Sequence, residues 1–408
     1  MATESEATGP VVNPELVGGT PIKWAVLEKD LQEHFGTDAK FGEHRSATKF
    51  GENQGYVSQI FLAEFDWQSG GDLPKKAIVK ITETENLRYI CEHVFKTDYD
   101  VMRQQVIKIH NNEYNMYKMM RDDWKCDQQL KMPALYCGRE YGRDEVEAGY
   151  LALEFVDNAI PRHMYHNVQP DSCEDVLRII AAMGSHSLKH QETVEKLKNE
   201  FVMDMFKDVF DLEKTKAGLP VLVGMFPELA SDQEFIESKM EAFVGMDSYY
   251  KVLNETCPVK MLVHGDLWSA NILWEQDKDG IYRIKKLIDW QISYAGNPVA
   301  DLNRFLNAAL DGEEKVRERE RLFKVYYDAL VNECQGEVDI PFTLEMLNEG
   351  YERLLPVLTF SVLPAFANLG AMVLQTVPES ERGAADKNMK GKMWTQIKES
   401  VEYLRKWY

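Results

Sequence analysis

Apolar positions follow two different spacings along the chain. Up to about residue 156, short apolar or β-branched runs alternate with turn-forming residues, which predicts strands. These predicted strands cover residues 56–65, 77–81, 133–138 and 149–156. Residues 24–35 have helical spacing instead, and from residue 171 onward apolar positions recur every three or four residues. The pattern therefore predicts an α+β chain with a β-rich N-terminal part and a helical C-terminal part.

Three short strands interrupt the helical part. Residues 261–263 and 272–274 are apolar runs, residues 284–288 are the third predicted strand, and Lys278-Asp279-Gly280 is a turn signal between the last two. The polar segment 264–271 joins the first two runs, and Asp289 follows the third. We therefore expect polar side chains to gather at the ends of rigid strands.

This segment carries the residue types that phosphoryl transfer requires. Asp266 is the candidate catalytic base, which accepts the proton of an acceptor hydroxyl. Asn271, five residues later, and Asp289 are the candidate ligands of Mg²⁺ on nucleotide phosphates. The Asp-to-Asn spacing alone also fits a common turn rich in Asp and Asn between two strands. The flanking strands and the later Ile288-Asp289 favour the kinase interpretation.

A lysine on a predicted strand is the candidate phosphate ligand. Lys80 stands among apolar residues of the run 77–81, where a lysine either reaches a nucleotide or extends to solvent at a strand edge. Glu113 falls on the apolar stripe of a predicted helix over residues 107–120 and needs a cationic partner if it is buried. The sequence predicts a Lys80–Glu113 pair, with Glu85 and Glu92 as rival partners.

The segment before the lysine strand contains a candidate phosphate loop. Gly51 and Gly55 bracket a turn one hairpin earlier, and backbone N–H groups of such a loop can approach phosphate closely. Ser58 is a candidate hydroxyl contact. An ordinary turn has the same composition, and the protein-kinase pattern G-x-G-x-x-G is not met, because position 53 is Asn.

These motifs together resemble a known group. His264-Gly265-Asp266-Leu267-Trp268-Ser269-Ala270-Asn271, Leu287-Ile288-Asp289-Trp290 and the later Asn297-Pro298-Val299-Ala300-Asp301-Leu302 look like the loops of kinase-like small-molecule phosphotransferases. That group includes aminoglycoside phosphotransferases and choline kinases. The residues of these motifs are most similar to those of the ecdysteroid-kinase-like (choline-kinase-like) branch. The resemblance implies a bilobal protein-kinase-like fold that binds ATP and Mg²⁺ between a small β-rich N-lobe and a larger helical C-lobe.

The resemblance also implies the division of the chain. Residues 1–20 would be a flexible lead-in, residues 21–156 the N-lobe and residues 157–408 the C-lobe. The end of the N-lobe would join the two lobes, and there the backbone groups of Glu154 and Val156 would pair with the adenine edge. We also expect Asp301 to cap the next helix and to brace the catalytic loop by hydrogen bonds. The apolar stretch 351–369, which Pro356 and Pro364 interrupt, would line the acceptor pocket or belong to the core.

Composition narrows the classes of partner and compartment. A formal charge of −20 argues against nucleic acid, because phosphate backbones select basic surfaces. The six cysteines are scattered without a C-x-x-C pair, as expected for reduced thiols in a cytoplasmic protein. No apolar run reaches the length of a membrane span, and the N-terminal residues lack the pattern of a secretory signal. We therefore expect no membrane association, and no obligate protein partner is evident.

The expected activity is an ATP- and Mg²⁺-dependent transfer of the γ-phosphoryl group to a hydroxyl of a small metabolite. Asp301 follows Asp289 by only twelve positions, which is too short for the peptide-docking segment of protein kinases, so a protein acceptor is less favoured. The resemblance points to a steroid, a choline-like molecule or a xenobiotic alcohol. The alternative is a catalytically inactive kinase-fold binding protein, a pseudokinase.

Overall fold

The chain forms two compact units in the computed structural model, and each unit is described by itself. The first contains Met1–Met119 and Pro133–Asp157, and the second contains Met120–Met132 and Asn158–Tyr408. The structure describes residues 13–50, 58–69, 71–84, 91, 98–142, 148–197, 202, 204–205, 207 and 209–408.

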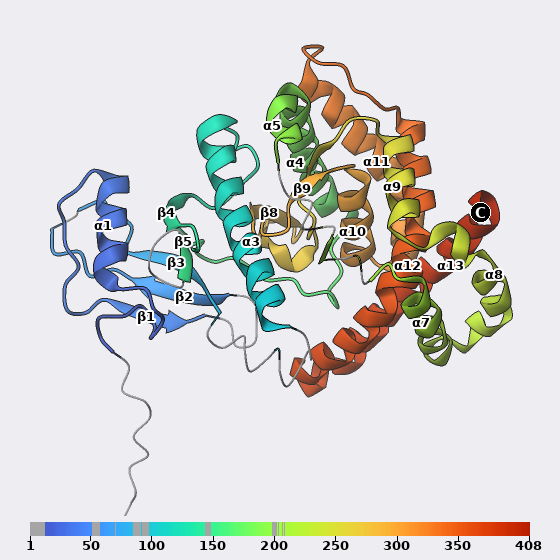
Figure 1. Cartoon of the computed structure of the whole chain (residues 1–408), viewed down its shortest axis with the longest axis horizontal. Coiled ribbons are helices and arrows are strands. Elements are labelled where there is room, and N and C mark those ends of the chain that lie inside the picture. The colour runs from blue at the N-terminus through green and yellow to red at the C-terminus, as the bar shows by residue number, and fades with distance from the viewer. Residues whose placement is uncertain are drawn as a thin grey trace, which may run out of the picture. The chain divides into compact units, whose positions relative to one another are not determined.

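The first unit is built on a five-stranded antiparallel sheet with strand order β1-β2-β3-β5-β4 (Figure 1). Its elements are α1 (Trp24–Phe35), β1 (Ser46–Lys49), β2 (Gln59–Glu64), β3 (Lys76–Glu83), α3 (Tyr99–Lys118), β4 (Leu135–Arg139) and β5 (Ala148–Glu154). Strand β3 lies at the centre of the sheet, where Lys80 is opposite Ile60 of β2 and Leu151 of β5. After α3 the chain continues as a π-helical turn, η2 (Met119–Asp123), whose residues from Met120 onward belong to the second unit.

The two faces of β3 serve different purposes, because successive side chains of a strand point to opposite sides. Ala77, Val79 and Ile81 are fully buried in a core that includes Trp24 and Leu27 of α1. The alternate residues Lys80 and Thr82 contact α3 through Glu113 and His110. Period-two alternation thus places one lysine on the face that α3 covers.

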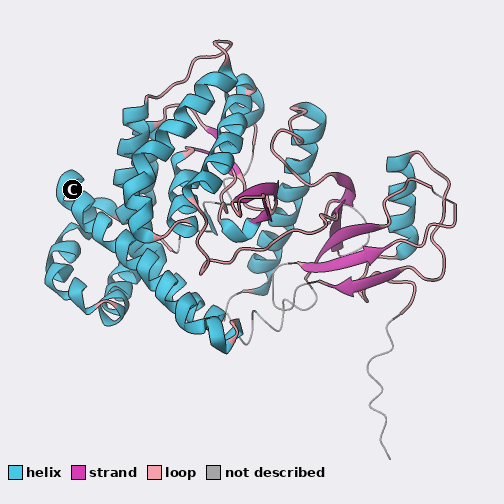
Figure 2. Ribbon diagram, turned by 180° about the vertical axis from the view of Figure 1, so that it is seen from behind, coloured by secondary structure: helices cyan, strands magenta, loops and turns pink. Residues whose placement is uncertain are grey.

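The second unit is mainly helical (Figure 2). Its helices and helical turns are α4 (Pro170–Lys189), α5 (Gln191–Glu195), α7 (Leu212–Met225), η3 (Pro227–Asp232), α8 (Gln233–Phe243), α9 (Met246–Thr256), η4 (Ser269–Asn271), α10 (Val299–Ala309), α11 (Gly312–Cys334), α12 (Leu344–Thr376) and α13 (Glu379–Trp407). Its strands are β6 (Met261–Val263), β7 (Ile272–Gln276), β8 (Tyr282–Leu287) and β9 (Tyr294–Gly296). Helix α4 packs along α11, and α12 packs along α13.

Two short antiparallel pairs support the polar loop in this unit. β6 pairs with β9, and β7 pairs with β8. The sequence predicted β6, β7 and β8 but not β9, which has only three residues and no apolar pattern of its own.

One helix differs from expectation. Helix α12 runs unbroken through Pro356 and Pro364, because its packing against α13, α7 and α9 compensates for the lost backbone hydrogen bonds. Gly218 of α7 faces Pro364 of α12, and a Cβ on Gly218 would lie 2.8 Å from the proline ring.

The α+β class, with a β-rich first unit and a helical second unit, is confirmed. Within the described ranges, no helix combines the length and apolar character needed to cross a bilayer.

Candidate active site

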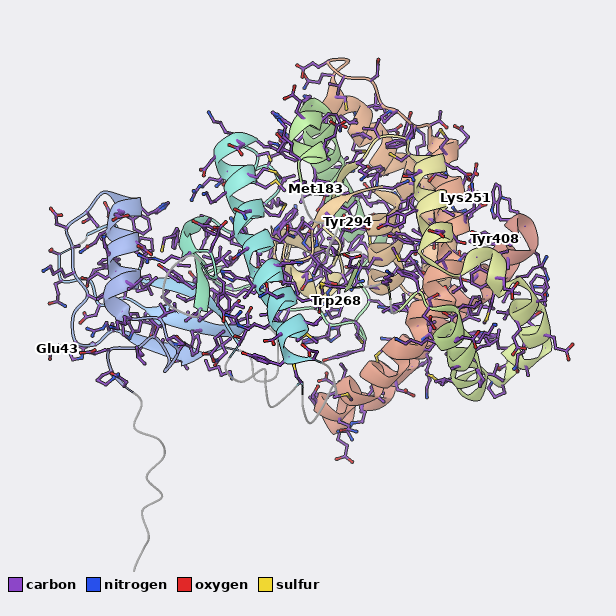
Figure 3. The ribbon with its side chains drawn as sticks, in the orientation of Figure 1. Glu43, Met183, Lys251, Trp268, Tyr294 and Tyr408 are labelled. Carbon is purple, nitrogen blue, oxygen red and sulfur yellow. The ribbon has the colours of Figure 1, made fainter. Side chains whose placement is uncertain are left out.

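The loop between β6 and β7 has a backbone conformation that requires glycine at its second residue. Gly265 has a φ of 81°, and a Cβ there would lie 2.3 Å from the carbonyl oxygen of Ile292. Any side chain would therefore push the loop away from the segment that leads into β9. Tyr294 of β9, labelled with Trp268 in Figure 3, pairs with Val263 at the start of this loop.

A buried imidazole joins this loop to the end of β8. His264 is fully buried, and burial lowers its pKa, so the ring is neutral. Its Nε2–H donates to the carbonyl of Ile288 (3.1 Å), and Nδ1 accepts from the backbone N–H of Asp266 (3.3 Å). Both Asp266 and Asp289 lie close enough to favour the charged form of the ring, although burial outweighs them. His264 thus ties together the segments that carry the two aspartates.

Two side chains bind the carboxylate of Asp266. Asn271 donates from Nδ2 to Oδ2 (2.9 Å) and to the backbone carbonyl of Asp266 (2.8 Å). Arg304 of α10 forms an ion pair with Oδ1. The side chain of Asp266 retains 16% exposure, so a small molecule can still reach a carboxylate whose orientation is fixed on both sides.

Asn271 and Asp289, the predicted metal ligands, are connected through the backbone. The N–H of Ile288 donates to the carbonyl of Asn271 (3.0 Å), which brings Asp289 next to the loop. The Nδ2 amide group of Asn271 donates its hydrogen bonds to Asp266. The Oδ1 atom of Asn271 is therefore the atom suited to bind a cation. Asp289 has a φ of 69°, a left-handed conformation that aspartate tolerates better than most residues and that often marks functional positions.

This donor set suits Mg²⁺ held partly by phosphate. In the part of the chain that the structure describes, no three His, Cys, Asp or Glu side chains form a metal cage. Mg²⁺ commonly takes one or two carboxylates and completes its octahedron with substrate phosphates and water. One carboxylate and one amide oxygen fit that mode.

Asp301 braces the loop, as predicted, from the first turn of α10. Its carboxylate accepts the backbone N–H groups of His264 (2.7 Å) and Gly265 (3.0 Å). Burial raises its pKa to about 7, although these N–H groups and Arg304 favour the charged form. Asp301 does not cap the helix, because Pro298 occupies the cap position.

Asp301→Ala is expected to destabilise the protein by about 2–5 kcal/mol, because two N–H groups lose their acceptor in a buried environment. Asp301→Asn keeps one carbonyl acceptor and should cost about half as much. Denaturant unfolding measures the loss, and hydrogen exchange at His264 and Gly265 locates it. Unchanged protection of these two amides in Asp301→Ala would contradict the bracing role.

In the first unit, Lys80 and Glu113 form the predicted ion pair. Nζ of Lys80 lies 2.6 Å from Oε2 of Glu113, and the two side chains are 11% and 2% exposed. Glu113 is on α3, where Ile109 and Met116 bury the same face. The rivals Glu85 and Glu92 lie outside the described residues.

A hydrogen-bonded chain runs beside this pair. Nε2–H of His110 donates to the carbonyl of Arg139 (2.9 Å), so its Nδ1 accepts from the hydroxyl of Thr82 (3.0 Å). The hydroxyl of Ser58 must then donate to Thr82 Oγ1 (2.7 Å). Ser58, the predicted phosphate contact, is thereby attached to β3 and α3. Neither Thr82 nor His110 was expected from the sequence.

His110 should make the first unit sensitive to acid. Burial lowers its pKa from 6.5 to about 4. Above pH 6.5 the ring is neutral in both states, but as pH falls towards 4 only the unfolded chain takes up the proton. About 3 kcal/mol of stability should be lost across that window. Urea unfolding from pH 7 to 4 tests this, with His110→Gln as a variant that should lose less on acidification. Equal losses in both proteins would contradict the assignment.

The remaining predicted nucleotide contacts are placed as follows. Gly51 and Gly55 lie outside the described residues. Glu154 ends β5, where its N–H donates to the carbonyl of Ala134 (2.9 Å) and its carboxylate accepts the N–H of Ala134 (3.1 Å). A contact from Glu154 to adenine would therefore come from its carbonyl oxygen. Val156 follows in the segment after the strand, and its backbone contact stays a prediction.

Arg304 is the site residue that sequence reasoning missed. A signal was present, because Arg304 is the only Lys or Arg between Lys286 and Lys315, a stretch that contains two predicted site motifs. An isolated basic residue near two functional aspartates deserves consideration as their partner.

Comparison with known proteins gives one family match and one curated relative. A family model described as "Uncharacterized oxidoreductase dhs-27" (DUF1679) matches residues 16–408. The protein "Uncharacterized oxidoreductase dhs-27" of Caenorhabditis elegans is 24% identical over 317 residues, which are 73% of this chain. The chain spans about a third of the length of that relative, 36%.

Solved structures with similar folds include choline kinases and an aminoglycoside phosphotransferase. Choline kinase from Cryptosporidium parvum matches with a TM-score of 0.49 and 13% identity, over 89% of this chain and 93% of the other. Choline kinase LicA from Streptococcus pneumoniae matches with 0.39 and 13%, over 92% and 98%. APH(2")-IIIa, solved with GDP and kanamycin, matches with 0.42 and 12%, over 92% and 99%. These similarities concern the fold alone.

Proposed function

The chain belongs to the DUF1679 family, and we propose that it transfers the γ-phosphoryl group of ATP to a hydroxyl of a small metabolite. The observation that carries the proposal is the loop in which Asn271 and Arg304 orient Asp266, with Asp289 joined to the same loop through Ile288. A carboxylate held beside a second carboxylate and an amide oxygen is what hydroxyl activation and metal–phosphate binding require.

The proposed step assigns one role to each group. The acceptor oxygen forms a bond to the γ-phosphorus while its proton passes to the carboxylate of Asp266. The bond from the γ-phosphorus to the bridging oxygen breaks, and its electron pair leaves on ADP. Asn271 and Asp289 would hold Mg²⁺, which neutralises phosphate charge when bound.

The first unit would supply the remaining nucleotide contacts. Lys80 would bind the α- and β-phosphates, with Glu113 fixing its direction through the 2.6 Å contact. Gly51, Gly55 and Ser58 would approach the phosphates, and the backbone groups of Glu154 and Val156 would meet the adenine edge. These contacts are part of the proposal.

A small acceptor is favoured over a protein acceptor. Only residues 290–298 separate Asp289 from α10, and three of them form β9 against β6. That segment is too short and too constrained to present a platform for a peptide. We propose an alcohol of the steroid, choline-like or xenobiotic class, on the family resemblance of the motifs.

The oxidoreductase name of the relative does not transfer to this chain. That name belongs to a protein of which this chain matches 36%. Dinucleotide-dependent oxidoreductases of the doubly wound type use a parallel sheet with a glycine-rich turn. Every strand pair of the described sheets is antiparallel.

A thermal-shift titration tests the proposal. ATP at a hundred times its dissociation constant should stabilise the protein by about 2.7 kcal/mol, and EDTA should remove the Mg²⁺-dependent part. Asp289→Asn should lose that part too, while keeping a residue that tolerates the left-handed backbone. Asp279→Asn, in the exposed turn between β7 and β8, is the control and should behave like the wild type. No shift at millimolar ATP with Mg²⁺ would refute the proposed function.

A further inference from the structure

Phosphoryl transfer needs positive charge on the transferring group as well as on the nucleotide. The transition state spreads negative charge over three equatorial oxygens, and many phosphotransferases place a cationic side chain there. Two residues after Asp266, the loop carries Trp268, which has no charge. A cationic side chain that assists Mg²⁺ at the transferring group would therefore come from another element.

Helix α10, which is not part of the loop between β6 and β7, contributes a cationic side chain to it. Asp301 and Arg304 are three residues apart, so they lie on the same face of α10 one turn apart. Asp301 holds the N–H groups of His264 and Gly265, and Arg304 pairs with the next residue, Asp266. One turn of α10 thus contacts three consecutive residues of the loop and fixes where the guanidinium lies.

The exposure of the pair favours a role beyond bracing Asp266. The side chain of Arg304 is 31% exposed, against 16% for Asp266, so the guanidinium is the more accessible member. A guanidinium is a planar fork with five N–H donors, and it can bind a carboxylate and a phosphoryl oxygen together. A residue that only anchored Asp266 would not need to remain this accessible.

We propose that Arg304 is a catalytic residue that binds the equatorial oxygens of the transferring phosphoryl group beside Asp266. The inference rests on the proposed function and adds a role to the same site. During transfer the acceptor proton goes to Asp266, the new O–P bond forms, and the leaving electron pair stays on ADP. Arg304 neutralises the charge on the phosphoryl oxygens and exchanges no proton.

Binding of a transition-state mimic tests Arg304 without knowledge of the acceptor. The probe is ADP with Mg²⁺, measured by calorimetry with and without aluminium fluoride, which imitates the transferring group. Wild type should bind the aluminium fluoride complex about 100-fold more tightly than ADP with Mg²⁺ alone. Arg304→Met should bind ADP with Mg²⁺ within about threefold of wild type but lose most of the gain, while Arg304→Lys should retain part of it.

A matched control separates this role from general loss of an ion pair. Arg283→Met removes an arginine of similar exposure, 34%, whose partners Asp175 and Asp277 lie outside the predicted site. It should keep the full gain from aluminium fluoride. If Arg304→Met keeps the gain as well, or if wild type binds ADP but shows no gain, the proposal for Arg304 is overturned. If wild type binds no nucleotide, the proposed function itself fails and this inference with it.

Discussion

Replacing Asp266 with asparagine is expected to lower kcat by about 10²–10⁴-fold while ATP binding stays close to that of the wild type. The amide has nearly the shape of the carboxylate, so the loop that Asn271 and His264 hold should persist. It cannot accept the acceptor's proton, however, and the step that forms the new O–P bond loses its base.

ADP release with a panel of alcohol acceptors measures this effect, and thermal shift with ATP and Mg²⁺ checks that binding remains. Asp279→Asn, an exposed aspartate in the turn between β7 and β8, should leave both values unchanged. An Asp266→Asn protein as active as wild type would show that Asp266 is not the base. A wild-type protein that binds ATP but transfers phosphate neither to an alcohol nor to water would favour the pseudokinase alternative.

Lys80→Met is expected to destabilise the first unit by about 3–5 kcal/mol, because it leaves the carboxylate of Glu113 buried without its cation. Glu113 is 2% exposed, so water cannot replace the lost partner at 2.6 Å. The change should also weaken ATP binding if Lys80 contacts the phosphates.

A double-mutant cycle isolates the pair. Glu113→Leu combined with Lys80→Met should recover most of the stability, because the buried charge is removed together with its partner. Lys76→Met on the same strand is the matched control, since Lys76 is 44% exposed and lies 4.0 Å from Glu64. It should change stability by less than about 1 kcal/mol. Additive effects of the Lys80 and Glu113 changes would show that the two side chains are not energetically coupled.

The elements that the sequence predicted best are those with a strong local period. The helix predicted at residues 24–35 is α1, which Gly36 ends in a left-handed conformation. The apolar run that contains Lys80 is the central strand β3, and the helix predicted over residues 107–120 is the C-terminal part of α3. In each case the apolar residues of the segment recur at the spacing of a helix or form the apolar run of a strand, so the local sequence alone identifies the element.

Predictions failed where a distant partner outweighed local preference. Pro356 and Pro364 were expected to interrupt a helix, yet α12 continues through them because α7, α9 and α13 pack along it. β9 forms where β6 pairs with it, and Tyr294-Ala295-Gly296 contains no apolar run that would mark it as a strand in the sequence.

The sequence by itself determined which residues carry chemistry in this protein. Asp266, Asn271 and Asp289 follow short strands, Lys80 interrupts an apolar run, and Glu113 lies on the apolar stripe of a helix, so each stands out from its neighbours. The sequence also predicted the Lys80–Glu113 contact, but the tertiary structure alone decided which side chains hold Asp266 and its loop. Arg304 reaches Asp266 across 38 positions of chain, and Asp301 holds the loop across 36 and 37, through a helix whose packing no local pattern encodes. The physical reason is that residue type and period act over a few residues, whereas an ion pair requires two distant backbones to meet within a few ångströms.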